Sequence, residues 1–228
     1  MKKYLSIVMI LLILIGVSAC KKEEKNTNPS ALAFKEEYES LNGKTNASGK
    51  EHRTVTIDQD NPFEKVEASK IVELLNNKET FYVYFGDPLC PWCRSVIEKS
   101  IEVANKNNIS KIYYVKVWDE DGNEILRSKY TLDKKDKPKL ITAGTEAYEL
   151  LLKAFDNVLS DYNLQTSKGK TVKVGEKRIY APNFIYVKEG KAEKLISGYS
   201  EKQTDAREEL TKEMLEDEEK IFDEFFKN

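Results

Sequence analysis

The sequence is poor in the residues that build metal centres. Its 228 residues include only three cysteines and one histidine. A structural zinc site normally takes four cysteine or histidine ligands, so this supply argues against a metal. The one histidine, His52, stands in a polar stretch without a partner motif. It is interpreted as a solvated surface histidine.

Neither sign of charge dominates the chain. Lysine and arginine number 37 and aspartate and glutamate 39, which leaves a formal net charge of −2. Nucleic-acid-binding proteins carry a basic patch or stripe, and we expect no nucleic acid as a partner here. The composition, 40% hydrophobic and 33% charged, is typical of a globular body with a heavily solvated surface. The length suits one domain with additions.

The first twenty residues have the pattern of a secretory signal. Lys2 and Lys3 precede an apolar run, and small residues follow it up to Cys20. The run is too short and wrongly flanked for an ordinary membrane span. The ending VSAC resembles the lipobox of bacterial lipoproteins, which implies cleavage and a Cys20 that carries palmitate or another acyl chain. The alternative is an uncleaved N-terminal anchor, and both readings tether the body to the extracytoplasmic face of the cell membrane.

Outside the cytoplasm disulfides form and persist, and lipid on Cys20 would leave Cys90 and Cys93 as the free pair. Their spacing closes a loop too small to constrain the unfolded chain much, so a purely structural disulfide is a weak explanation. The pair stands between an apolar run, residues 80–86, and a helical pattern of apolar residues. This position favours redox chemistry.

The expected chemistry follows from the junction of a strand with a helix. Cys90 would be the N-cap of the helix, where unpaired N–H groups stabilise a thiolate and lower its pKa below about 8.5. Pro91 fits the first helical position, where no N–H is needed. Cys93 then lies one turn on, placed to resolve a mixed disulfide on Cys90 in a reversible two-electron exchange. Arg94 either adds positive charge or is an exposed residue that pairs with Glu98.

Periodicity predicts the other elements of the chain. After a signal over residues 1–20, a flexible tether with a possible short helix spans 21–52, and the folded domain spans 53–228. Within the domain, Pro62 is expected to open a helix, and Gly190 to form the turn of a hairpin. We expect strands at 53–57, 80–86, 111–119, 170–174, 180–190 and 191–199, and helices at 62–77, after Cys93, at 144–163 and in the tail from 201.

The order strand, C-x-x-C, helix, strand is the thioredoxin signature. Residues 53–228 resemble the thioredoxin superfamily, and most of all the thioredoxin-like lipoproteins of Gram-positive bacteria. Phe85 and CPWC match the strand end and the active-site motif, and YAPNFIYVKEGK resembles the strand that begins with a cis proline. The resemblance implies an α/β, thioredoxin-like fold with a central mixed sheet flanked by helices and a helical insertion at about 120–178. It also implies a cis Ala181–Pro182 bond against the cysteines, where Pro182 positions substrate; an ordinary trans proline at a strand start is the alternative.

The chain departs from thioredoxin itself in several places. Tyr84 occupies the position of a buried acid that handles protons, and Leu89 that of a tryptophan before the first cysteine. Asp87 is nearby but is interpreted as a loop residue ahead of a proline. Between the cysteines, Trp92 follows Pro91, a dipeptide that matches neither cytosolic reductants nor strong periplasmic oxidants. The direction of electron flow therefore stays open.

The resemblance implies a membrane-anchored thiol–disulfide oxidoreductase that needs no cofactor, because the dithiol carries the electrons. Its partners would be exported proteins with cysteines and a membrane redox protein that resets the pair. One alternative is a thioredoxin-like accessory or binding protein for secretion, of the bacteriocin transport accessory type. A glutaredoxin-like role is another. The helix at 144–163 either covers the sheet or shapes a partner-binding surface over Cys90.

Overall fold

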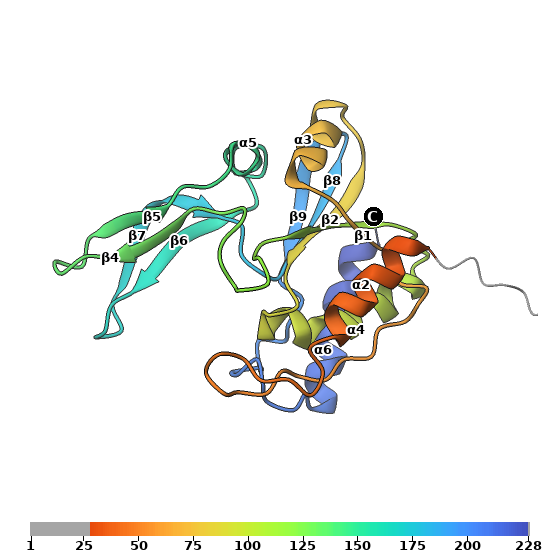
Figure 1. Ribbon diagram of the computed structural model, residues 1–228. Coiled ribbons are helices and arrows are strands. Elements are labelled where there is room, and N and C mark those ends of the chain that lie inside the picture. Colours follow the sequence, from red (N-terminus) through yellow and green to blue (C-terminus); the bar gives the residue numbers. More distant parts are fainter. Residues whose placement is uncertain (1–27, 228) are drawn as a thin grey trace, which may run out of the picture.

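A five-stranded mixed sheet forms the centre of the computed structural model, which describes residues 28–227. The signal, Cys20 and the start of the predicted tether lie outside the described residues. Four strands run in the same direction and one, β8, runs against them (Figure 1). In spatial order they are β1 (Phe63–Lys65), β3 (Ile112–Lys116), β2 (Phe81–Gly86), β8 (Asn183–Lys188) and β9 (Lys191–Ile196).

Helices cover both faces of this sheet. What we name the site face packs against α2 (Pro29–Glu39), α4 (Pro91–Lys106) and α6 (Lys212–Phe226). The opposite face packs against α3 (Ala68–Asn76) and α5 (Glu146–Ala154). The predicted α/β class, with a central mixed sheet flanked by helices, is confirmed.

The two faces divide the strand residues by simple alternation. In β2, Tyr84 packs on the site face, and Val83 and Phe85 pack on the opposite face. In β8, Phe184 and Ile185 divide in the same way. Successive side chains of a strand point to opposite faces, so a strand covered on both sides is apolar throughout. The unbroken apolar run at 80–86 therefore marks a central strand, as predicted.

The insertion before β8 is mainly strand, where the sequence predicted a helical insertion. It forms two hairpins, β4 (Lys129–Leu132) with β5 (Pro138–Thr142) and β6 (Ser160–Gln165) with β7 (Thr171–Arg178). The hairpins extend away from the central sheet, and we name them the arm (Figure 1).

The helix predicted at 144–163 is correspondingly too long. It ends at Ala154, and the chain turns there and enters β6. Phe155 and Leu159 are buried within the turn, and Tyr162 is buried from the strand. The apolar residues at helical spacing thus lie in three different local structures, a helix, a turn and a strand. Periodicity alone cannot distinguish these from one long helix.

Buried ion pairs join the arm to the body. Glu124 Oε1 lies 2.6 Å from Arg127 Nη2 and 3.0 Å from Arg178 Nη2. The same oxygen accepts a hydrogen bond of 3.0 Å from the Trp118 indole. Arg178 also donates to the Ser128 carbonyl, so both guanidinium groups are held within the base of the arm. Hydrogen-bonded pairs of this kind fix geometry well when every member is satisfied.

Two other predicted elements at the start of the domain are wrong. Residues 53–57 are extended, but they form no sheet ladder, because the Asn42 amide binds the backbone of Val55 and the Glu39 carboxylate accepts from Ile57 N. Pro62 opens no helix. Phe63 instead begins β1, a strand too short to be recognised by alternation, and α3 follows from Ala68.

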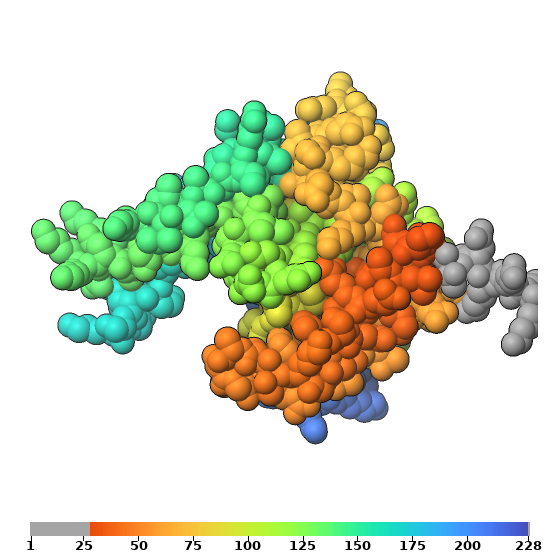
Figure 2. Space-filling model, viewed as in Figure 1, coloured from red at the N-terminus to blue at the C-terminus, as the bar shows by residue number. Residues whose placement is uncertain are grey.

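The segment assigned to a flexible tether is part of the folded body from Pro29 onward. Helix α2 buries Ala31, Phe34 and Tyr38 against the site face, and the segment lies across the body (Figure 2).

His52 is only 6% exposed, so its interpretation as a solvated surface histidine is also wrong. The hairpin of β8 and β9 is confirmed, with a positive φ at Gly190. Within residues 28–227, no helix has the length and apolarity needed to cross a membrane.

Candidate redox site

The cysteine pair lies where β2 gives way to α4. Cys90 is the N-cap residue of α4 with extended backbone, and Pro91 is its first helical residue, as the sequence predicted. Both cysteines are free thiols, with Cys90 4% exposed and Cys93 fully buried. The outer sulfur is therefore the accessible one, and the inner sulfur is one helical turn deeper.

The environment shifts the pKa values of the two thiols in opposite directions. A hydrogen bond from the Cys93 thiol holds the pKa of Cys90 below its usual value, and the backbone N–H groups of Cys93 and Trp92 add to this effect against the cost of burial. Burial raises the pKa of Cys93 well above its usual value, and the neighbouring Cys90 raises it further. Thiolate character therefore concentrates on Cys90.

Two tyrosines form a hydrogen-bonded chain that ends at Cys93 on its buried side. A hydrogen bond from the Tyr84 hydroxyl favours the thiolate of Cys93 and lowers its pKa, and the Asp87 backbone N–H acts in the same direction. The Tyr84 hydroxyl in turn lies 2.8 Å from the hydroxyl of Tyr38, which comes from α2. Burial raises the pKa of both tyrosines well above the usual value, so both stay protonated.

Gly86 makes room for this chain. A Cβ atom at Gly86 would stand 2.1 Å from the Tyr84 hydroxyl oxygen, far inside contact distance. Tyr84 and Gly86 are two residues apart on β2 and so share one face. The absent side chain at 86 lets the ring of Tyr84 lie along the strand toward the cysteines.

Arg94 is buried and clamps the N-terminal segment to the site. Its guanidinium donates to the carbonyl of Arg53 at 2.7 Å, the carbonyl of Tyr38 at 2.8 Å and Oδ1 of Asn42 at 2.7 Å. A fourth bond of 3.4 Å reaches the carbonyl of Pro88 in the loop that precedes Cys90. The expectation of an exposed residue paired with Glu98 is wrong. Arg94 instead ties two segments of the chain together beside Cys93.

Asp87 is a buried acid at the edge of the site. It is fully inaccessible, and its carboxylate accepts from Leu89 N at 2.8 Å and from Trp118 N at 3.3 Å. Burial raises the pKa of Asp87 to about 7, against the lowering effect of these bonds and of the Lys116 charge. The sequence suggested a loop residue, and burial gives it a titration near neutral pH.

The strand β8 brings a second motif to the cysteines. The Ala181–Pro182 bond is cis, as the sequence predicted. The Cys90 thiol lies 3.5 Å from the carbonyl oxygen of Ala181. Beside it is a groove of about 380 Å³, and Trp92 and Pro182 both line it. Tyr199 packs against Trp92 in a tilted arrangement, with ring centroids 4.6 Å apart, and forms another part of the wall.

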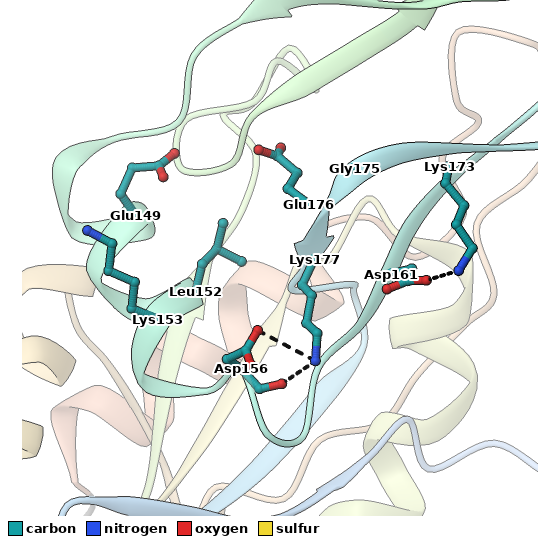
Figure 3. Close-up of a pocket in the computed structure, with 9 residues that line it drawn as sticks. All are labelled: Glu149, Leu152, Lys153, Asp156, Asp161, Lys173, Gly175, Glu176 and Lys177. Carbon is teal, nitrogen blue, oxygen red and sulfur yellow. Dashed lines mark hydrogen bonds and ion pairs between the residues drawn. The ribbon is translucent and has the colours of Figure 1, made fainter.

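A larger cavity than this groove lies elsewhere. It measures about 780 Å³ and lies between α5 and the hairpin of β6 and β7, where Lys177 pairs with Asp156 and Lys173 with Asp161 (Figure 3). Its walls contain neither cysteine nor any other residue of the redox site. Within residues 28–227, no cluster of histidine, cysteine, aspartate and glutamate side chains is arranged to hold a metal ion.

The structure thus brings together every described residue that the sequence assigned to the site, namely Cys90, Cys93, Pro91, Trp92, Ala181 and Pro182. Cys20 lies outside the described residues. Sequence reasoning placed Tyr38 in the possible short helix of the tether, which α2 confirms, but did not connect this residue with the site. The spacing of Ala31, Phe34 and Tyr38 at three and four residues was the available signal for a helix with a buried stripe.

Comparison with known proteins identifies no relative of this chain: no family model matches the sequence, and no curated protein matches it.

Proposed function

We propose that the protein is a thiol–disulfide oxidoreductase of thioredoxin-like fold, anchored by lipid on Cys20 to the extracytoplasmic face of the membrane. One observation carries the proposal: Cys90 occupies the N-cap of α4 with Cys93 one turn on, and the carbonyl of Ala181 lies 3.5 Å from its sulfur. Two motifs far apart in the chain thus meet at one sulfur. The anchoring rests on the VSAC leader.

In the proposed reaction the Cys90 thiolate attacks one sulfur of a substrate disulfide. A mixed disulfide forms at Cys90, and the other substrate sulfur leaves as a thiolate. Cys93 then loses its proton and attacks the Cys90 sulfur, which forms the Cys90–Cys93 disulfide and releases the second substrate thiolate. Two electrons pass from the dithiol to the substrate. The same steps in reverse oxidise a substrate dithiol, and a membrane redox partner would reset the pair.

The groove beside Cys90 supplies a place for the substrate chain. Its wall at Ala181 and Pro182 suits an extended substrate segment that lies along the backbone there. The aromatic wall of Trp92 and Tyr199 offers contact area to a side chain next to the substrate cysteine. Exported proteins with cysteines are the substrate class that fits this site.

Trapping of mixed disulfides tests the proposal. In cells expressing the full chain, Cys93→Ser should accumulate mixed disulfides with exported proteins, because the attack that releases them is lost. Cys90→Ser is the matched control and should trap none. The complexes should appear in the membrane fraction and move to the soluble fraction when Cys20→Ala is added. Equal trapping by both serine variants, or none by either, contradicts the proposal.

A secretion accessory protein is the second candidate, and the arm favours it. Leu140 and Ile141 on β5 are 46% and 53% exposed, and as successive strand residues they point to opposite faces, so either face of the arm offers a partner one large apolar side chain. An accessory role requires no reactive thiolate. Alkylation of Cys90 at the rate of an ordinary thiol would therefore support this candidate over the enzyme.

A further inference from the structure

The redox step proposed above has a difficulty at Cys93. This sulfur is completely buried, and burial disfavours its charged form. Yet Cys93 must become a thiolate when it attacks the mixed disulfide, and it leaves as a thiolate when the exchange runs in reverse. Some group must stabilise the negative charge in that position. Tyr84 occupies the position at which thioredoxin has a buried acid, and Tyr84 stays uncharged.

We infer that Tyr84 and Tyr38 form a hydrogen-bonded chain that stabilises the Cys93 thiolate as the Cys90–Cys93 bond forms or breaks. The N-terminal helix α2, which supplies Tyr38, is then part of the redox site. This inference rests on the proposed function.

The direction of each hydrogen bond follows from the donors present. A hydroxyl has one proton to donate, and a thiolate can only accept. When Cys93 is charged, Tyr84 donates to its sulfur, and the Tyr84 oxygen is free to accept from Tyr38, 2.8 Å away. Each bond polarises the next, so the second hydroxyl strengthens the first as a donor. Neither tyrosine gives up its proton, and the proton of Cys93 leaves with the substrate thiolate.

The packing holds the chain in place. The Tyr84 ring stacks on Phe184 and on Tyr114, with centroids 4.4 Å and 5.6 Å apart. Arg94 donates to the backbone carbonyl of Tyr38, which fixes that end of the chain to α4. A donor already held at the reacting atom needs no reorganisation during the step. By microscopic reversibility, the same donor assists resolution in one direction and departure of Cys93 in the other.

A matched control lies in the same cluster. Tyr114 is buried against Tyr84, but its hydroxyl has no hydrogen-bond partner within the described structure. Tyr114→Phe therefore removes a buried hydroxyl from the same environment without touching the chain. The Asp87 backbone N–H acts on Cys93, and the charge of its buried carboxyl acts on Cys90, so Asp87→Asn tests this carboxyl as the rival proton-handling group.

The experiment uses the reduced full chain in detergent, mixed with 5,5′-dithiobis(2-nitrobenzoate). The first release of nitrothiobenzoate reports attack by Cys90, and the second reports resolution by Cys93. We expect Tyr84→Phe to slow the second phase about 10-fold or more, because hydrogen bonds to charged groups are strong. Its pH profile should move to higher pH. Tyr38→Phe should slow the same phase about 3-fold, and Tyr114→Phe should leave it unchanged.

Three outcomes would overturn the inference. In the first, Tyr84→Phe and Tyr114→Phe give the same second phase. In the second, Asp87→Asn slows that phase while Tyr84→Phe does not, which assigns the role to the carboxyl. In the third, the wild-type chain shows no second phase, and the proposed function then fails with the inference. Circular dichroism of each variant confirms that the rates belong to folded protein.

Discussion

The two faces of the central sheet are buried equally well but are built from different side chains. The site face takes Tyr84 and Phe184 from β2 and β8, and the opposite face takes Val83, Phe85 and Ile185 from the same two strands. One face therefore has hydroxyl groups within reach of the cysteines, and the other is largely aliphatic packing. Burial alone therefore does not make a site: the proposed redox chemistry depends on which polar atoms are buried with the sulfur.

The N-terminal segment belongs to the site face, and Phe34→Ala tests this most directly. Phe34 is buried in α2 and stacks on Phe63 with centroids 4.3 Å apart. We expect the free energy of unfolding to fall by about 4 kcal/mol, because the substitution leaves a large cavity. Denaturant titration of the reduced protein measures it. A loss below about 1 kcal/mol would contradict this packing and would support the flexible tether that the composition suggested.

On the opposite face, Leu151→Ala should affect stability without affecting the thiols. Leu151 is buried in α5, and its removal should cost about 3 kcal/mol. Leu150, the next residue on the same helix, is 43% exposed, so Leu150→Ala is a matched control that should cost under about 0.5 kcal/mol. Both variants should resolve mixed disulfides at the wild-type rate. A slower second phase in Leu151→Ala would show that the two faces are coupled.

Asp87 should make stability depend on pH in an unusual direction. Its pKa rises from 3.8 to about 7 on folding, so the folded state binds more protons between these values, and this group's contribution falls as pH rises. From pH 5 to pH 8, Asp87→Asn should gain roughly 2–3 kcal/mol relative to the wild type. Burial also raises the pKa of Glu218 to about 8, but Glu218 is present in both proteins, so its effect on the two stability curves cancels. Parallel stability curves for the two proteins would contradict the buried, titrating carboxyl.

The sequence alone determined the features that depend on neighbours along the chain. The run at 80–86, Pro91 between the cysteines and the apolar stripe beyond Cys93 predicted a central strand, a helix start and an amphipathic helix, and all three are present. The hairpin with Gly190 in its turn was predicted for the same reason. Alternation, helical spacing and turn residues are local signals, and they survive folding where the long-range structure agrees with them.

Tertiary structure decided what joins the site together. Tyr38 and Tyr84 are 46 residues apart, and no spacing rule relates them; only the docking of α2 on the site face brings their hydroxyls within 2.8 Å. The sequence left Arg94 open between a positive charge at the site and an exposed helix residue, and only the packing of residues 38–53 over it supplied the carbonyl partners of its guanidinium. The arm is a further example. Tyr162 continues the helical spacing of α5 in the sequence, but it lies in β6, which pairs with β7. Long-range contacts override local pattern wherever they bury more of the chain than the local structure could.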